Sequence, residues 1–203
     1  MNSECCATKT KLLDTMIELL WEHSFSSVSV DDVCKRAGVK KGSFYHFFPS
    51  KTDLAAAAME HHWAGKAAEL DAVFSAQKPA RRRFQDLCLG ILQAQQEKQA
   101  AFGKVCGCPF FTIGAEMSTQ DEQLRAQSGL MFQRYHRYYA SAIRDGMAAG
   151  EFRASDPDAK ATEALAFVMG MLFQAKVQNN LEPLRHIESG LWALLGVPLA
   201  QAA

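Results

Sequence analysis

The stretch SVDDVCKRAGVKKGSFYHFFPSK, residues 29–51, predicts two short helices joined by a glycine turn. Ser29 is a helix-capping residue and Asp32 can return its hydrogen bond, so we expect a helix to begin here. Gly38 is the residue type that ends a helix in a left-handed conformation at little cost. Between them, apolar residues recur at helical spacing and give the helix one apolar face: Val30, Val33, Cys34 and Ala37.

The second helix of this stretch is predicted to run from about Lys41 to Phe48, because Pro49 stops it. Phe44 and Phe48 fall on one side of that helix. Two short helices around such a turn are typical of a helix-turn-helix, whose second helix lies in the major groove of DNA.

Local charge also favours a DNA partner. The whole chain has 22 basic and 22 acidic residues, so its net charge indicates nothing. Residues 35–51 hold no Asp or Glu, yet they contain Lys35, Arg36, Lys40, Lys41 and Lys51. A solvated face on an ordinary helix pair would also explain these charges. Tyr45 and His46 on the polar side of the second helix favour phosphate contact instead.

The segment AGVKKGSFYHFFPSK, residues 37–51, resembles the signature of the tetracycline-repressor (TetR) family of bacterial regulators. The preceding LLDTMIELLWEHSFSSVSVDDV, residues 12–33, resembles the first helix of that family and the start of its second. The match covers roughly residues 9–60. Phe47 departs from the pattern, because many relatives carry His or Tyr at this position.

The resemblance implies roles for individual residues at a double-stranded operator. Base edges would be approached by Lys41, Gly42 and Ser43. Phosphates would be held by Tyr45, His46 and Lys51, with Ser29 donating from the start of its helix and Lys40 among the neighbouring cations. Gly42 also has a physical reason, since a missing side chain lets the backbone come close to the groove.

Composition limits the class of protein to which the whole chain can belong. A length of 203 residues with 48% hydrophobic and 22% charged residues fits a globular protein of one or two domains. No apolar run reaches the ~18 residues of a membrane span, and the start MNSECCATKTKLL shows no signal-peptide plan. We therefore expect a cytoplasmic protein with no membrane partner, whose cysteines are thiols. Neither a cofactor nor a metal is expected, because Cys106 and Cys108 have no second ligand pair nearby in the sequence.

Helical periodicity continues to the C-terminus, and strand signals are scarce. Beyond residue 51 we expect helices at about 52–74, 80–98, after Pro109, 121–149, 158–178 and 184–195, with a loop at 99–108. The prediction is an all-α protein of about nine helices. Residues 1–51 form a three-helix helix-turn-helix head, and residues 52–203 form a helical bundle for sensing and dimerisation.

The last two predicted helices are unusually apolar, as LAFVMGMLF (residues 165–173) and LWALL (191–195) show. Such helices are normally buried on more than one side. An ordinary intrachain core would account for this. A homodimer through these two helices is favoured, because one short recognition helix contacts few bases and such proteins commonly dimerise over a two-fold operator. The family resemblance implies the same interface.

The sensor is expected in VCGCPFFTIGAEM, residues 105–117. Cys108 precedes Pro109, which favours the first position of a helix, and the N-terminus of a helix stabilises a thiolate. Cys106 would be its resolving partner, and Lys176 a cation that approaches from the penultimate helix. The segment also resembles a TetR branch with a Gly-Cys motif that includes electrophile- and oxidant-responsive repressors. Burial as a small hydrophobic residue is the competing interpretation of each cysteine.

Three hypotheses follow. The first is a dimeric repressor released by thiol modification or a reactive electrophile. The second is the same repressor induced by noncovalent binding of an apolar or aromatic molecule. The third, a helical cysteine enzyme, has no catalytic motif in its favour, so we expect no enzyme. The pocket of the second hypothesis would be lined by Phe102, Phe110, Phe111, Phe132 and Tyr135.

Overall fold

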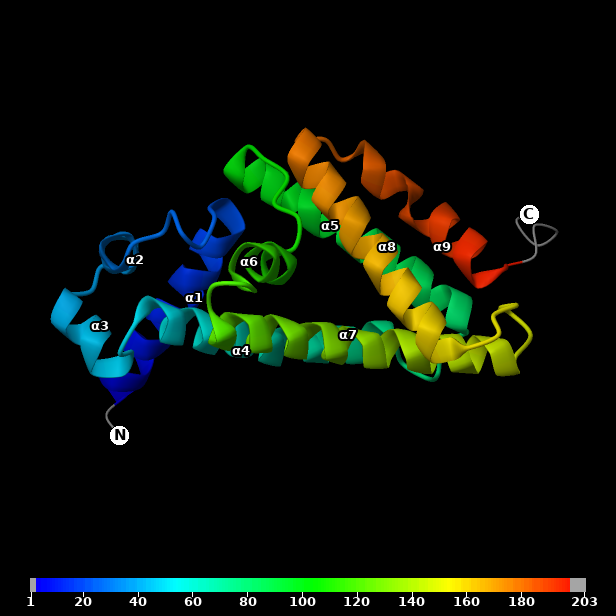
Figure 1. Cartoon of the computed structure of the whole chain (residues 1–203), viewed down its shortest axis with the longest axis horizontal. Helices are drawn as coiled ribbons and strands as arrows, with labels where there is room; N and C mark the ends of the chain where they lie inside the picture. The colour runs from blue at the N-terminus through cyan, green and yellow to red at the C-terminus, as the bar shows by residue number, and fades with distance from the viewer. Residues whose placement is uncertain (1–2, 198–203) are drawn as a thin grey trace. The chain divides into compact units, whose positions relative to one another are not determined.

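The computed structural model describes residues 3–197, with side chains from Cys6 onward. Over this range the chain forms nine α-helices and a 3₁₀-helix, without a β-strand, which confirms the all-α fold (Figure 1). None of the helices within residues 3–197 combines the length and apolarity that crossing a membrane requires. In chain order the helices are α1 (Ser3–Glu22), α2 (Val30–Ala37), α3 (Lys41–Phe47), α4 (Lys51–Val73), α5 (Ala80–Phe102), α6 (Pro109–Met117), α7 (Glu122–Ala148), α8 (Pro157–Gln178), the 3₁₀-helix η1 (Glu182–His186) and α9 (Ile187–Leu195).

The described chain divides into two compact units. The first unit runs to Ala67 and resumes at Cys108–Met131, so it contains α1, α2, α3 and α6, most of α4 and the start of α7. The second unit contains the end of α4, the rest of α7, and α5, α8, η1 and α9. These units are defined by packing. The predicted boundary between residues 51 and 52 separates functions and stays a prediction.

Helix α2 is delimited by local chemistry, as the sequence predicted. The hydroxyl of Ser29 accepts from the N–H of Asp32 at 3.1 Å, and the Asp32 carboxylate accepts from the N–H of Ser29 at 2.9 Å. At the other end Gly38 has φ +63°, the N–H of Val39 donates to Cys34 O at 3.0 Å, and the N–H of Gly38 donates to Lys35 O at 3.2 Å. This pair of bonds is a Schellman motif, which requires the left-handed residue. It directs the chain into α3.

The core of the first unit holds this helix-turn-helix on α1. Helix α1 packs against α2 and α6, and α2 packs against α3. Met16 of α1, Val33 of α2 and Phe44 of α3 are fully buried. Burying side chains of this size stabilises a fold by about 1.5–3 kcal/mol each, so these three residues fix α3 with its other side outward.

The second unit is organised around α5, α8 and α9. Arg83 of α5 is buried and donates to Asp145 at 2.6 Å and to Lys78 O at 2.9 Å. Glu151 accepts from the N–H of Arg81 at 2.8 Å and so satisfies the start of α5. Helix α8 packs against α9, where the Phe167 ring covers Gly190 so closely that a Cβ there would lie 2.2 Å from Cζ.

Two predicted boundaries were wrong. Helix α5 continues to Phe102 rather than ending near residue 98, and Gly103 ends it with φ +70°. The helix-forming alanines 100 and 101 favour continuation until a residue that accepts the left-handed conformation. The predicted helix 184–195 begins instead as the 3₁₀-helix η1, and α9 starts only at Ile187. For the other helices beyond residue 51, each predicted start or end lies within one residue of the observed one.

Candidate nucleic-acid interface and sensor loop

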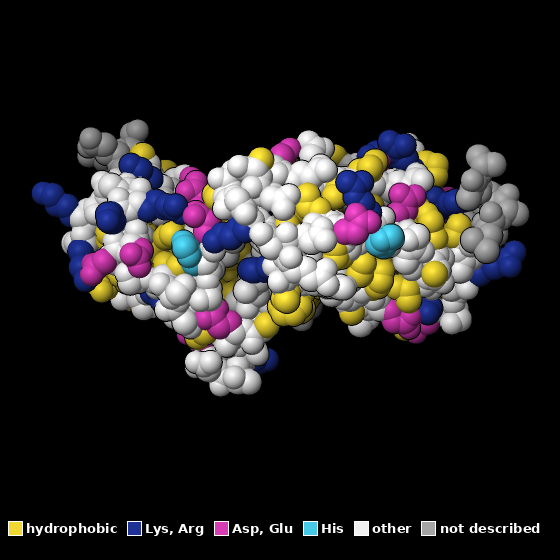
Figure 2. Space-filling model, turned by 90° about the horizontal axis from the view of Figure 1, so that it is seen from above, with side chains coloured by type: hydrophobic (Ala, Val, Ile, Leu, Met, Phe, Trp, Pro, Cys, Tyr) yellow, Lys and Arg dark blue, Asp and Glu magenta, His cyan; other side chains and the backbone are white. Residues whose placement is uncertain are grey.

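Helix α3 buries its apolar residues and exposes its polar ones. Phe44 is fully buried, and Phe48, which caps the helix, is nearly so. Tyr45 is 52% exposed. Figure 2 shows Lys and Arg side chains, in dark blue, over the N-terminal helices at the left of the view. Of the predicted DNA-binding residues of this segment, Ser43 is half-buried and the following are exposed: Lys40, Lys41, Gly42, Tyr45 and His46.

Gly42 lies inside α3 without an intrachain reason to be glycine. A Cβ built at this position would meet nothing within 4 Å. Glycine inside a helix costs about 1 kcal/mol relative to alanine. The missing side chain leaves the backbone of α3 open to a partner outside the chain.

Three of the predicted DNA-binding residues have partners within the chain. The Lys41 ammonium lies 2.9 Å from the Asp31 carboxylate of α2. The Ser29 hydroxyl donates to Asp32 at 2.6 Å as part of the cap of α2. The Lys51 ammonium donates to the carbonyls of Phe25 (2.9 Å) and Val28 (2.7 Å), and burial lowers its pKa. Their contacts with DNA stay predictions, as do those of the other residues.

The segment between α1 and α2, which we call the α1–α2 turn (residues 23–29), is clamped from two helices. Lys51 of α4 binds its carbonyls, as described above. Glu116 of α6 accepts from the N–H of Phe25 at 2.9 Å and from the N–H of Ser26 at 2.8 Å. Burial raises the pKa of Glu116, but the hydrogen bonds from Ser26 and Phe25 and the charge of Lys51 outweigh it and hold that pKa below its ordinary value. The carboxylate of α6 therefore positions the segment that leads into the helix-turn-helix.

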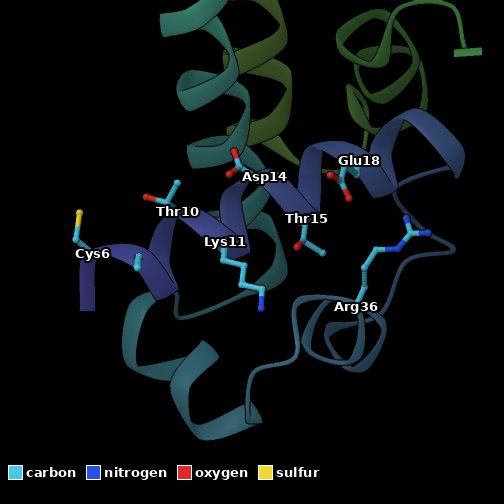
Figure 3. Close-up of a pocket in the computed structure, with 8 residues that line it drawn as sticks. Cys6, Thr10, Lys11, Asp14, Thr15, Glu18 and Arg36 are labelled. Atoms are coloured by element: carbon cyan, nitrogen blue, oxygen red, sulfur yellow. The ribbon is translucent and has the colours of Figure 1, made fainter. Parts of the chain in front are cut away.

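An open groove of about 830 Å³ follows α1 in the first unit (Figure 3). The residues that line it are Cys6, Ala7, Thr10, Lys11, Asp14, Thr15, Glu18 and Arg36. Its charges are mixed, and Arg36 is already paired with Glu22. None of the predicted site residues lies here, and the charges do not select one class of ligand.

A buried glutamine of the second unit fixes the backbone of Cys106 and Gly107, which belong to the segment before α6 that we call the sensor loop (residues 105–108). Gln95 of α5 is 3% exposed. Its Oε1 accepts from the N–H groups of Cys106 (3.1 Å) and Gly107 (2.8 Å), and its Nε2 donates to Gly107 O at 3.0 Å. Asn179, which caps α8, accepts from the N–H of Val105 at 2.9 Å.

Lys176 of α8 also lies against the sensor loop. Gly107 has φ +69°, and a Cβ there would lie 3.2 Å from Lys176 Cδ and 3.3 Å from Leu172 O. The aliphatic part of Lys176 therefore packs on the glycine between the two candidate cysteines. A larger residue at 107 would have to displace it. Cys106 is 1% exposed.

Cys108 belongs to the first unit and is the N-cap of α6, followed by Pro109, as predicted. It is half-buried. The predicted sensor residues thus divide between the units, with Cys106 and Lys176 in the second. The predicted ligand-pocket residues divide likewise: Phe110 and Phe111 lie in the first unit, and Phe102, Phe132 and Tyr135 in the second. The sensor and the pocket stay predictions. Within residues 3–197, His, Cys, Asp and Glu side chains do not gather in threes as a metal site requires.

Sequence reasoning missed Gln95, Glu116 and Asp31. Gln95 stands in the polar run QAQQEKQ, residues 93–99, where no pattern distinguishes the buried glutamine from its exposed neighbours. Glu116 is an acid in an otherwise uncharged and largely apolar helix, and that contrast was the available signal. Asp31 precedes the capping residue Asp32, and a second acid in a first helical turn is unremarkable by sequence.

Comparisons with known proteins agree with this fold. Residues 12–58 match the family model described as bacterial regulatory proteins, tetR family, and residues 80–191 match the tetracyclin repressor-like C-terminal domain. The chain is similar to the transcriptional regulator AcuR of Cereibacter sphaeroides, with 33% identity over 177 residues, 85% of this chain and 78% of AcuR. It is also similar to the HTH-type transcriptional repressor NemR of Escherichia coli strain K12, with 24% identity over 192 residues, 94% of this chain and 95% of NemR.

Solved structures show the same fold. The reduced form of E. coli NemR aligns with a TM-score of 0.81 and 25% identity, over 95% of this chain and 99% of that one. A regulatory protein TetR from Rhodobacter sphaeroides aligns with a TM-score of 0.81 and 30% identity, over 91% and 97%. Regulators of this kind are not enzymes, so the cysteine-enzyme hypothesis is set aside. Because the C-terminal model alone matches more than half of its length, the chain belongs to the TetR family of DNA-binding transcriptional regulators.

Proposed function

We propose that this regulator is a repressor that acts in the cytoplasm as a homodimer. It binds a two-fold symmetric operator through α3 and releases it when thiols of the sensor loop react with an oxidant or an electrophile. The observation that carries operator binding is the exposed polar side of α3, with Gly42 open to the outside. The similarity to NemR, which is named a repressor, supports repression.

A second copy of the chain is the proposed partner of α8 and α9. Exposed apolar or small residues recur along α8 every three or four positions: Ala166, Gly170, Phe173 and Val177. Phe173 is 46% exposed and Val177 69%, and a Cβ at Gly170 would meet nothing within 4 Å. Hydrophobic side chains, in yellow, reach the surface over the second unit at the right of Figure 2. Binding to successive major grooves of a two-fold operator requires the two α3 helices of such a dimer to lie about 34–36 Å apart, or a multiple of that distance.

Cys108 is the proposed first site of modification. Its side chain is half-buried, whereas Cys106 is almost fully buried, so an external reagent meets Cys108 first. With hydrogen peroxide, the Cys108 thiolate attacks one oxygen, the O–O bond breaks, and a sulfenic acid and hydroxide result. The Cys106 thiol then condenses with the sulfenic acid, which forms a disulfide and releases water. With an α,β-unsaturated carbonyl, the thiolate adds to the β-carbon: an S–C bond forms, the C=C π bond breaks, and the α-carbon takes a proton from water.

Lys176 is proposed to assist this chemistry. Its aliphatic part already packs on Gly107, between the two cysteines in sequence. An ammonium close to a thiol favours the reactive thiolate. Replacing Lys176 by methionine keeps the packing and removes the charge, so the rate of thiol modification should fall while the melting temperature is kept.

Helix α6 is the proposed relay to the DNA-binding head. It begins after Cys108 and carries Glu116 near its other end, where the carboxylate clamps the α1–α2 turn. A modification that tilts α6 would therefore pull on the turn that leads into α2 and α3. This route lies wholly within the first unit. It would change the presentation of α3 and thereby the spacing that two-fold DNA requires.

The test measures operator binding of the parent and single cysteine variants under reducing conditions, after peroxide, and after an electrophile. The operator is first obtained by selecting bound duplexes from a random pool. We expect the parent to release DNA on treatment and Cys108→Ser to stay bound. Cys6→Ser is the matched control, because Cys6 is an exposed thiol of the same unit, and it should respond like the parent. Release of Cys108→Ser by both reagents contradicts the thiol mechanism.

That contradictory result would favour the second hypothesis. A protein without Cys106 and Cys108 that still releases DNA with an apolar ligand has a noncovalent inducer. Phe110, whose ring centroid lies 5.5 Å from that of His62, would then be the first pocket residue to replace.

A further inference from the structure

The acidic side chain of Asp31, in α2, contacts the first residue of α3. Residues 35–51 contain no Asp or Glu. The first turn of α2 contains Asp31 and Asp32, and Asp32 is used in the cap with Ser29. Asp31 has another partner, since its Oδ1 lies 2.9 Å from the ammonium of Lys41, the first residue of α3. Both side chains of this pair are more than half exposed.

The pair lies at the junction of α2 and α3. Burial raises the pKa of the Cys34 thiol, Asp31 raises it further, and Lys41 lowers it, so both charges are close to this residue. The hydrogen bond with Asp31 raises the pKa of Lys41. The two side chains therefore stand together on the outer side of the helix-turn-helix, next to Gly42.

A carboxylate on this surface opposes DNA binding unless it gains a hydrogen-bond donor. Phosphates repel it, and most major-groove edges of bases carry acceptors. Cytosine N4 offers a donor that Asp and Glu accept, and guanine O6 and N7 accept from Lys. A carboxylate and an ammonium held 2.9 Å apart thus match a cytosine and a guanine that are paired or adjacent.

We propose that Asp31 is a specificity-determining residue of the operator interface, which accepts from cytosine N4 while the Lys41 beside it donates to guanine. In doing so Asp31 also keeps the Lys41 ammonium from settling on a phosphate, where it would bind any sequence. The inference rests on the proposed placement of α3 in the major groove and goes beyond it, because it assigns a base to a residue of α2.

The test selects bound duplexes from a random pool with the parent, Asp31→Ala and the control Glu18→Ala. Glu18 is an exposed acid on α1 in the same unit, and its charge interacts with that of Arg36 (Figure 3). The control therefore removes one negative charge at a different place in the unit. We expect a conserved cytosine in each half-site of the parent and of Glu18→Ala. Asp31→Ala should lose that base, with discrimination at this position reduced about five- to tenfold.

Nonspecific binding gives a second readout. With random duplex, Asp31→Ala should bind several-fold more tightly than the parent. Its affinity should also fall more steeply with salt, by about 0.9 in the logarithmic slope, because the released Lys41 gains a phosphate. In a Lys41→Gln background, Asp31→Ala should leave the salt slope unchanged.

The outcomes separate cleanly. If Asp31→Ala selects the same bases as the parent, Asp31 does not determine specificity. If it weakens all duplexes alike and lowers the melting temperature, the pair is only a structural brace and the inference is wrong. If the parent selects no duplex at all, the proposed operator binding fails instead.

Discussion

Single polar side chains hold two loops of this protein in place. Glu116 satisfies two N–H groups of the α1–α2 turn, and Gln95 satisfies two N–H groups and a carbonyl of the sensor loop. A buried N–H that loses its partner lowers the free energy of unfolding by about 1–3 kcal/mol, so replacing either residue should destabilise the fold measurably. Each acts on a segment outside its own helix.

Replacing Gln95 should therefore loosen the sensor loop. We expect Gln95→Leu to lower the free energy of unfolding by about 2–4 kcal/mol, because the N–H groups of Cys106 and Gly107 lose their acceptor inside the protein. Gln96→Leu changes an exposed neighbour and is the control. Denaturant unfolding measures the stability, and the rate of labelling by a thiol reagent measures access to Cys106. Equal labelling rates in the two variants would show that Gln95 does not protect this cysteine.

Gly42 offers a prediction in which stability and function move in opposite directions. Gly42→Ala should stabilise α3 by about 0.5–1 kcal/mol, since alanine favours a helix and its Cβ meets no atom of the chain. The same methyl should keep the helix backbone from the groove and weaken operator binding about tenfold or more. Thermal melting and a binding titration check the two parts. Unchanged operator affinity would mean that the backbone at Gly42 does not approach DNA.

Residues that act locally were predictable from sequence, whereas those that act at a distance were not. Ser29, Gly38 and Pro109 are recognised from their neighbours, and the structure places each at the expected helix end. Gln95 and Glu116 acquire their roles only when α5 meets the sensor loop and α6 meets the α1–α2 turn. Asp31 is similar, because its partner Lys41 lies across the glycine turn.

At the scale of the element, boundaries followed the residues that can end a helix. Predicted ends at Gly38 and near Pro49 were accurate because these residues restrict the backbone locally. The end of α5 was wrong because alanine-rich sequence contains no stop before Gly103. The 3₁₀ start of the last helix was also missed, since periodicity does not separate the two helix types over so few residues.

The clamp between α6 and the α1–α2 turn should depend on pH. The folded-state pKa of Glu116 is lowered from an ordinary value of 4.5, so the carboxylate contributes stability above about that pH. This contribution is lost as pH falls through the folded-state pKa, because the protonated group no longer accepts as strongly. Glu116→Gln should cost about 1–2 kcal/mol at pH 7, where charge-assisted bonds are replaced by weaker ones.

Unfolding of the parent and Glu116→Gln at pH 7 and at pH 3 measures this effect. The difference between the two proteins should shrink at the lower pH. If α6 is the relay, Glu116→Gln should also respond less to oxidant in operator binding. A constant stability difference across this pH range would show that the charge of Glu116 does not strengthen the clamp.

At the scale of the whole molecule, the chain passes from the second unit to the first between Gly107 and Cys108. The proposed sensor thus belongs to the segment where the chain enters the unit that carries the helix-turn-helix. The relay from Cys108 to Glu116 needs one short helix, and α6 provides it. The proposed operator binding also calls for a second copy, since one short recognition helix contacts few bases.

We expect the second copy to bind at the exposed face of α8. Val177→Glu places a charge where an apolar side chain is 69% exposed in the single chain, so it should disfavour dimerisation without disturbing the core. We expect sedimentation to show a monomer or a weakened dimer, and operator affinity to fall at least tenfold at protein concentrations where the parent is dimeric. Gln178→Glu changes the charge of an exposed polar neighbour and is the control. The melting temperature separates loss of dimer from loss of fold. If the Val177→Glu protein stays fully dimeric, the interface does not include this end of α8. Ala166→Glu would then test the other end of the same face.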